Sequence, residues 1–155
     1  MTARPEAMHW DGETVDNDFL PEERLFLRIP PQHTDGERLL PTAVRSTDQS
    51  VNREKYGPKP EWVLWRFNER TGKDEFLVAW AVFAIKVGEI PSPVSVPNAD
   101  AVEYRVEHDP IPLNSSHSEI RAFKNDNRKA DINKRVAAEF KKEFCKVCGL
   151  VRRPA

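Results

Sequence analysis

The stretch EHDPIPLNSSHSEI, residues 107–120, gathers side chains that could carry out acid–base chemistry. Histidine titrates near neutral pH, so His108 and His117 could both donate and accept protons. Asn114 and Glu119 complete a set that could bind a ligand or transfer a proton. Two prolines fix the backbone path between these groups. The stretch therefore predicts either a functional loop or a stiff polar connection between two strands.

Two chemistries suit these residue types. One is cleavage of RNA phosphodiesters by a pair of histidines. The other is handling of a nicotinamide dinucleotide, which would recruit Arg28, the Ser46, Ser50 and Arg53 segment, and Glu119. That order is loosely similar to the order in ADP-ribosyltransferases, although no local motif is specific. The candidate catalytic residues are His108, His117, Glu119 and Arg28.

A second polar cluster lies in SVNREKYG, residues 50–57. Arg53, Lys55 and Tyr56 could bind a phosphate and stack on a base. The alternative is an ordinary charged surface loop. The candidate ligand-binding residues are Ser50, Arg53, Tyr56 and Asn114.

His117-Ser118-Glu119 is followed by Cys145-Lys146-Val147-Cys148, and together they contain the residue types of the zinc-deaminase signature. Their context differs from that family, because Phe144 rather than a proline precedes the pair and the cysteines end a helix instead of opening one. We therefore predict no metal and no cofactor. The two cysteines are expected to be small buried apolar side chains.

The composition fits one domain of an ordinary globular protein. The chain has 155 residues, of which 39% are hydrophobic and 32% are charged. No apolar run approaches the ~20 residues of a membrane span, and the first residues do not resemble a secretory signal. A soluble cytoplasmic protein without a membrane partner is the expectation.

The net charge of −1 conceals an uneven distribution of charge along the chain. Residues 1–23 contain seven acids and one base, whereas residues 121–155 contain eleven bases and four acids. A basic end of this kind could dock an acidic protein or a nucleic acid. The side chains expected to form a solvent-facing basic patch are Lys134, Arg135, Lys141, Lys142, Arg152 and Arg153.

Hydrophobic periodicity predicts a flexible acidic arm over residues 1–22 and a single α+β domain over 23–155. Strands are expected at 25–29, 39–46, 76–87, 102–107 and 118–125, a polar loop at 47–60, and a short helix at 60–67. Residues 76–87 are apolar on both faces, so a buried helix remains the alternative there.

The last segment has the spacing of an amphipathic helix. Apolar residues recur at Ile132, Val136, Phe140 and Phe144, with Asp131 as the expected N-cap. The predicted fold is a small, largely antiparallel sheet with a short central helix and a long C-terminal helix packed on one face.

Two functions remain open at this point. One is a small interaction module that docks an unknown protein, or a nucleic acid, through the basic C-terminal helix. The alternative is a small enzyme that acts on a nucleotide or RNA through the 108–119 loop. Convergence of His108, His117, Arg28 and Arg53 on one cleft would favour the enzyme.

Overall fold

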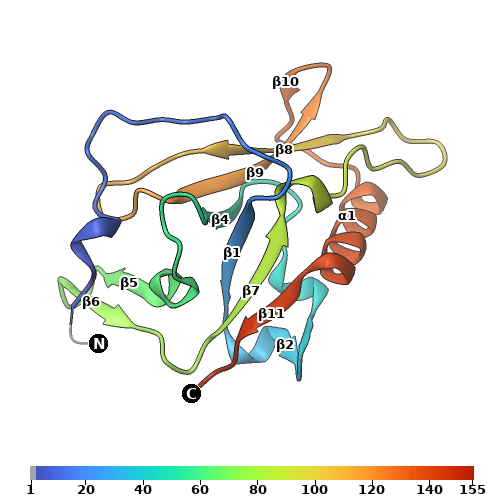
Figure 1. Cartoon of the computed structure of the whole chain (residues 1–155). Coiled ribbons are helices and arrows are strands. Elements are labelled where there is room, and N and C mark those ends of the chain that lie inside the picture. The colour runs from blue at the N-terminus through green and yellow to red at the C-terminus, as the bar shows by residue number, and fades with distance from the viewer. Residues whose placement is uncertain (1–2) are drawn as a thin grey trace.

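The computed structural model describes residues 3–155, and it is an α+β fold whose strands pair in antiparallel fashion (Figure 1). The longer strands are β1 (Arg24–Ile29), β4 (Gln49–Arg53), β5 (Trp65–Asn68), β6 (Lys73–Phe76), β7 (Ala81–Lys86), β8 (Glu103–His108), β9 (His117–Lys124) and β11 (Gly149–Arg152). Three two-residue strands are β2 (Thr34–Asp35), β3 (Arg38–Leu39) and β10 (Asn127–Arg128). The α-helix of the described residues is α1 (Lys134–Val147), and 3-10 helices span Glu6–Met8, Pro31–His33, Pro41–Ala43, Pro60–Leu64 and Val87–Glu89.

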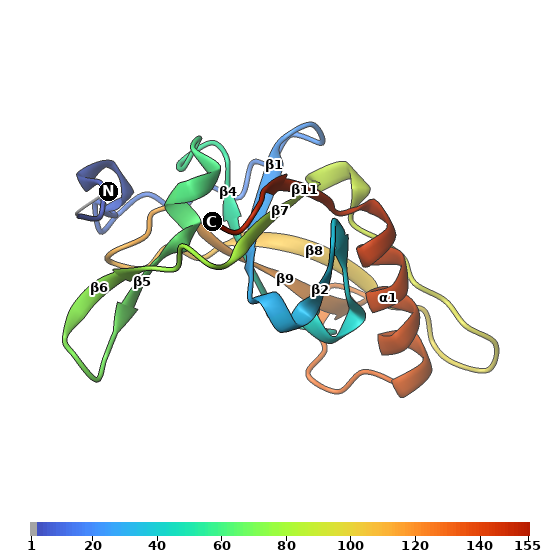
Figure 2. The ribbon, with the colours of Figure 1, turned by 90° about the horizontal axis from the view of Figure 1, so that it is seen from below.

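One main sheet organises the described chain. Its strands follow the order β10-β9-β4-β1-β7-β11, and β8 also pairs with β9. The small hairpins β2–β3 and β5–β6 lie outside this sheet. Figure 2 shows the β5–β6 hairpin at one end of the molecule and α1 at the other.

Successive side chains of strand β1 point to opposite faces of the sheet, so they belong to two different apolar clusters. Leu25, Leu27 and Ile29 face the main core, which also contains the buried residues of α1. Phe26 faces the opposite side and packs in a smaller cluster with the Pro60–Leu64 helix and β7. The sheet is therefore covered by α1 on one face and only partly covered on the other.

Helix α1 closes the main core with a stripe at helical spacing. Val136, Phe140 and Phe144 are fully buried, as the periodicity predicted. Phe140 stacks on Tyr104 of β8, with 3.8 Å between ring centroids. The long C-terminal helix of the prediction is thus a helix of 14 residues.

The predicted N-cap of this helix is wrong. Asn133 rather than Asp131 caps it, because the Asn133 side chain accepts hydrogen bonds from the backbone N–H groups of Arg135 and Val136. Gly149 follows the helix as predicted, but it also begins β11, which pairs with β7.

Two predictions for the region before β5 are also wrong. The expected polar loop contains β4, a central strand with Gln49, Asn52 and Arg53 buried. The expected strand at 39–46 is limited to β3, and Pro41–Ala43 forms a 3-10 helix. Proline lacks the N–H that a strand ladder requires, which explains the early end of β3.

The apolar segment 76–87 is a strand for only part of its length. β6 ends at Phe76, a turn follows, and β7 begins at Ala81 with five consecutive buried residues. The interpretation as a strand is right for β7, which is buried on both faces. The expected central helix is the 3-10 helix Pro60–Leu64.

The acidic N-terminal segment contacts the rest of the chain. Met8 is buried, its carbonyl accepts a hydrogen bond from the Ser115 N–H at 2.7 Å, and the Trp10 N–H donates to the Pro112 carbonyl at 3.1 Å. Figure 1 shows that the chain after Trp10 runs beside β8. Whether residues 1–22 are flexible remains a prediction, and residues 1–2 lie outside the described part.

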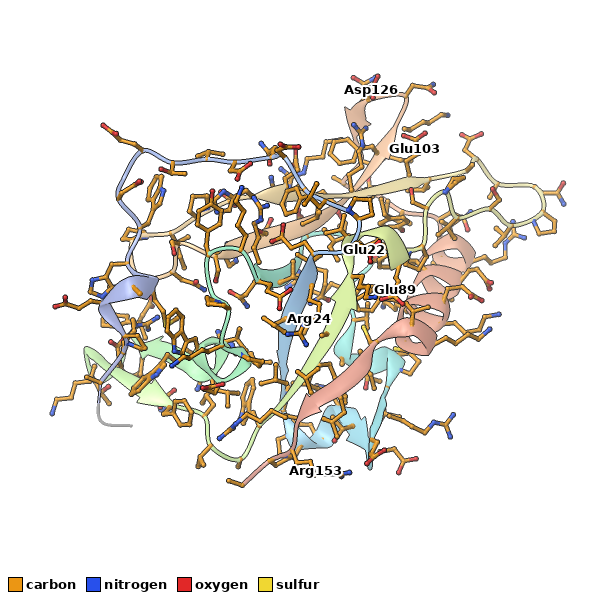
Figure 3. All side chains as sticks on the ribbon, in the orientation of Figure 1. Glu22, Arg24, Glu89, Glu103, Asp126 and Arg153 are labelled. Carbon is orange, nitrogen blue, oxygen red and sulfur yellow. The ribbon has the colours of Figure 1, made fainter. Side chains whose placement is uncertain are left out.

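Most of the expected basic patch faces solvent. Lys134, Arg135, Lys142 and Arg153 are exposed, and Lys141 and Arg152 are half-buried. Figure 3 labels Arg153 at the C-terminal end of the chain, where it pairs with Glu37. No helix in residues 3–155 has both the length and the apolar character to cross a bilayer.

We predict that Phe140→Ala lowers the free energy of unfolding by about 3–5 kcal/mol, because it removes a fully buried ring and leaves a cavity. Val147→Ala is the matched control on the same helix, since Val147 is 39% exposed. Denaturant unfolding of the two variants measures the difference. Equal stabilities would contradict the packing of α1 described above.

Candidate functional site

The sheet face opposite α1 carries polar side chains from three neighbouring strands. The register pairs Asn52 of β4 with His117 of β9 and Ser50 with Glu119. Because side chains alternate along a strand, these four lie on one face. Arg28 of β1 shares that face, since the β1–β4 register places it there.

A cavity of about 500 Å³ lies on this face. Arg28, Ser50, Asn52 and His117 line it from the sheet. The β5–β6 hairpin contributes a second side and the loop between β8 and β9 a third, and Arg4 comes from the N-terminal segment. Three arginines and one histidine thus line the cavity, and the described lining contains no aspartate or glutamate.

Of the three arginines, Arg28 has the least of its positive charge offset by acidic side chains. Its guanidinium group donates hydrogen bonds to the carbonyls of Trp65, at 3.0 Å, and Val63, at 3.4 Å. Burial, together with repulsion from Arg66 and Arg4, lowers the pKa of Arg28 to about 10, while Glu75 acts in the opposite direction. Three positive charges are therefore held close enough together to repel one another.

Arg4 and Arg66 each have one acidic partner on the hairpin. Arg4 Nη2 donates to Asp74 at 2.7 Å, while Arg66 lies 2.5 Å from Glu75. Arg4 Nη1 also donates to the Leu113 carbonyl at 3.1 Å, so this side chain joins the hairpin to the β8–β9 loop. Both arginines are consequently fixed in place beside the cavity.

Two buried donors of the cavity residues have no hydrogen-bond partner within residues 3–155. They are Nε of Arg4 and Nε1 of Trp65, in residues that are 9% and 5% exposed. A buried N–H without an acceptor costs about 1–3 kcal/mol. Both nitrogen atoms are almost entirely shielded from solvent, so they lie beside the cavity and are not exposed to it.

His117 is held with one ring nitrogen available. Its Nδ1 lies 2.8 Å from the Asp109 carbonyl oxygen, which can only accept, so Nδ1 carries a proton and donates. In the neutral ring Nε2 then has a free lone pair. His117 is half-buried and lines the cavity, so it could accept a proton or a hydrogen bond there.

Asparagine side chains attach the β8–β9 loop to the sheet. Asn114 Nδ2 donates to Asn52 Oδ1 at 2.7 Å, and Asn114 Oδ1 accepts from the hydroxyl of Ser116 at 2.6 Å. These bonds occupy much of the Asn114 amide. Its main effect is to hold the loop, although it also borders the cavity.

Arg53 lies elsewhere, and its fully buried side chain forms a network with the N-terminal segment. Its guanidinium group binds Glu23 through Nη2 at 2.7 Å and through Nε at 3.0 Å. It also donates to the backbone carbonyl of Asp16 and lies 3.8 Å from the centroid of the Phe19 ring. This pairing offsets the cost of burying the charge.

Tyr56 and His108 belong to the same network. The Tyr56 hydroxyl donates to Asp16 at 2.8 Å, and the ring stacks on His108 with 5.0 Å between centroids. His108 Nδ1 accepts from the Asp16 N–H at 2.9 Å, so Nε2 donates to the Ser115 carbonyl at 2.6 Å. Both nitrogens of His108 are therefore occupied within the protein.

The sequence-predicted residues thus divide into two groups. Arg28, Ser50, Asn114 and His117 line the cavity. Arg53, Tyr56 and His108 fasten the N-terminal segment instead. Glu119 shares the cavity face, but it is bound by Arg121 at 2.7 Å. His108, His117, Arg28 and Arg53 do not converge on one cleft.

The residues of the zinc-deaminase signature are also separated. His117 lies on the cavity face, whereas Cys145 and Cys148 pack against the main core on the other side of the sheet. Burial raises the pKa of both thiols, which disfavours thiolate ligands. In residues 3–155 no group of three or more His, Cys, Asp or Glu is placed to hold a metal ion.

Nine of the thirteen residues that line the cavity were not among the sequence candidates, and they include Arg4, Trp65, Arg66 and Phe67. The WRF triplet alternates aromatic and basic side chains in a segment that follows a short helix. That alternation was the available signal for a strand with a functional face. Nothing local to Arg4 indicated its place.

No protein-family model matches the chain, and no curated protein or solved structure shows significant similarity to it. A proposal for the function of the protein therefore rests on the chemistry of the cavity.

We predict that Glu23→Gln lowers the free energy of unfolding by about 3–5 kcal/mol, because it leaves the buried charge of Arg53 without its main partner. Glu22→Gln is the control, since the neighbouring Glu22 side chain, labelled in Figure 3, is 84% exposed. Its replacement should change stability by less than about 0.5 kcal/mol. Similar losses in the two variants would mean that the Arg53 network does not anchor the segment.

Proposed function

We propose that the protein binds a small anionic ligand in the cavity between the sheet, the β5–β6 hairpin and the β8–β9 loop. One observation carries this proposal: three arginines and a histidine line the cavity without a carboxylate among them. Arginine is the side chain best suited to carboxylate and phosphate groups, because its donors match their geometry.

The electrostatics favour an anion over a neutral ligand. A bound negative charge would offset the repulsion of Arg28 by Arg66 and Arg4, which Glu75 already offsets in part. A charged hydrogen bond contributes roughly 1.5–3 kcal/mol.

The basic C-terminal helix is a weaker candidate for the contact surface. Lys142 lies 3.1 Å from Glu139, and Lys146 lies 3.1 Å from Glu143, so acids of the same helix offset part of its charge. Such exposed cations commonly form a solvated helix face. Docking of an acidic protein or a nucleic acid through α1 remains a prediction.

We predict that Arg28→Gln weakens binding of inorganic phosphate or pyrophosphate at least tenfold, because it removes the central charge of the cavity. The exposed Arg38 of β3 provides the control variant, Arg38→Gln, which should bind as the wild type does. Calorimetric titration at low salt measures both affinities. Failure of all tested oxyanions to bind the wild type would refute the proposal.

Thermal melting of the same variants gives an independent readout. The lowered pKa of Arg28 means that folding disfavours its charge at neutral pH, so Arg28→Gln should lose little stability. A ligand that binds the folded state raises the melting temperature. Phosphate should therefore stabilise the wild type and Arg38→Gln but not Arg28→Gln.

A second function, catalysis on a phosphate ester, is favoured by His117. The Nδ1–H group of His117 donates to the Asp109 carbonyl. The lone pair of Nε2 is therefore available to accept a proton from another group. Next to the arginines, this nitrogen could take a proton from an attacking water or hydroxyl group while the guanidinium groups bind the phosphate oxygens. Catalysis of this kind requires one histidine rather than the pair expected from the sequence.

We predict that His117→Gln slows any hydrolysis of bis(p-nitrophenyl) phosphate by roughly 10²- to 10⁴-fold, the usual contribution of a general base. His33→Gln is the control, because His33 ends the 3-10 helix Pro31–His33 and does not line the cavity. Intact phosphate binding without turnover in the wild type would refute catalysis and leave the binding function standing.

A further inference from the structure

The cavity has an apolar part beside its arginines. Phe67 on β5 and Ile111 on the β8–β9 loop are each 45% exposed, and both line the cavity. Trp65, Pro112 and Leu113 extend the same two sides. Large apolar side chains left exposed on two sides of one cavity indicate a surface that an apolar group can cover.

The register of the hairpin places the aromatic side next to the charges. Phe67 pairs with Asp74 across the hairpin, and Asp74 is the residue that Arg4 binds. Trp65 lies two residues before Phe67 on the same strand, and its carbonyl accepts a hydrogen bond from Arg28. Arg66 pairs with Glu75 on the other face of the hairpin, so it is an anionic group held by Arg4 that would have its uncharged part against Phe67.

The opposite side is held at a fixed separation from the hairpin. Arg4 bridges the two by donating to both Asp74 and the Leu113 carbonyl. The Ile111–Asn114 turn is closed by backbone hydrogen bonds at 3.2 and 2.9 Å. Both apolar sides of the cavity are therefore held in place by hydrogen bonds.

The polar residues between the β5–β6 hairpin and the β8–β9 loop also indicate which kinds of ligand could bind. Ser50 and His117 line the sheet side of the cavity, and they offer both donors and acceptors. Hydroxyl groups of a sugar and the edge of a base would use such groups, whereas an alkyl chain would not. The volume of about 500 Å³ falls within the range of pockets for small organic ligands.

From these contacts we infer that the ligand is a nucleoside phosphate, with its phosphate at Arg4 and Arg28 and its base against Phe67 and Ile111. This inference rests on the proposed anion-binding function and specifies its ligand. The same chemistry is offered by a free nucleotide and by the terminal nucleotide of an RNA strand.

The test is a series of ligands that share a phosphate and differ in the attached group. Calorimetric titration compares inorganic phosphate, butyl phosphate, ribose 5-phosphate, the four nucleoside 5′-monophosphates and a 5′-phosphorylated RNA tetranucleotide. Stacking on an aromatic ring contributes about 1–3 kcal/mol per base. At least one mononucleotide should thus bind roughly 5- to 150-fold more tightly than ribose 5-phosphate.

Variants of Phe67 show whether the hairpin produces that difference. Phe67→Ala should abolish the preference for the nucleotide over ribose 5-phosphate and leave the affinity for inorganic phosphate unchanged. Phe67→Trp should keep the preference, because it restores a flat ring. Leu20→Ala is the control for loss of an exposed apolar side chain, since Leu20 is 67% exposed and does not line the cavity.

The outcomes separate this inference from the proposed function. Equal affinities for ribose 5-phosphate and all nucleotides, or equally tight binding of butyl phosphate, would overturn the nucleoside inference while anion binding stands. Binding of none of the series would overturn both. Tighter binding of the tetranucleotide, lost in Phe67→Ala, would support the inference and identify an RNA end as the source, and tighter mononucleotide binding would identify a free nucleotide.

Discussion

The register of β1 between β4 and β7 is the constraint on which the other features depend. With this register Leu25, Leu27 and Ile29 enter the main core, and Arg28 emerges on the opposite face. A shift by one residue would exchange the two faces and place the guanidinium group of Arg28 in the apolar core. The hydrophobic pattern of six residues therefore fixes both the core and the central charge of the cavity.

Patterns within a segment were sufficient to predict β1, β8, β9 and α1. Each shows the period of its own structure, because one side of each faces the core. Strand β4 could not be predicted in this way. Its buried Arg53 is compensated by Glu23, and its buried Asn52 donates to the Phe26 carbonyl, so its polar sequence resembles a loop until distant partners are known.

The candidate site was predictable to a similar extent. His117 and Asn114 were found because their loop concentrates polar groups, and Arg28 was found on its strand. His108 has the same side-chain chemistry as His117, but the Asp16 N–H and the Ser115 carbonyl occupy its two nitrogens. Sequence gives the chemistry of a side chain, whereas the availability of that side chain depends on partners brought together by folding.

Arg4 illustrates how far such partners can lie along the chain. It binds Asp74, 70 positions away, and the Leu113 carbonyl, 109 positions away. One of the three positive charges of the cavity is therefore supplied by the N-terminal segment rather than by the sheet. Proteolysis just after Arg4, or a bulky fusion placed directly before it, would alter the ligand site without touching the core, and a C-terminal fusion would avoid that disturbance.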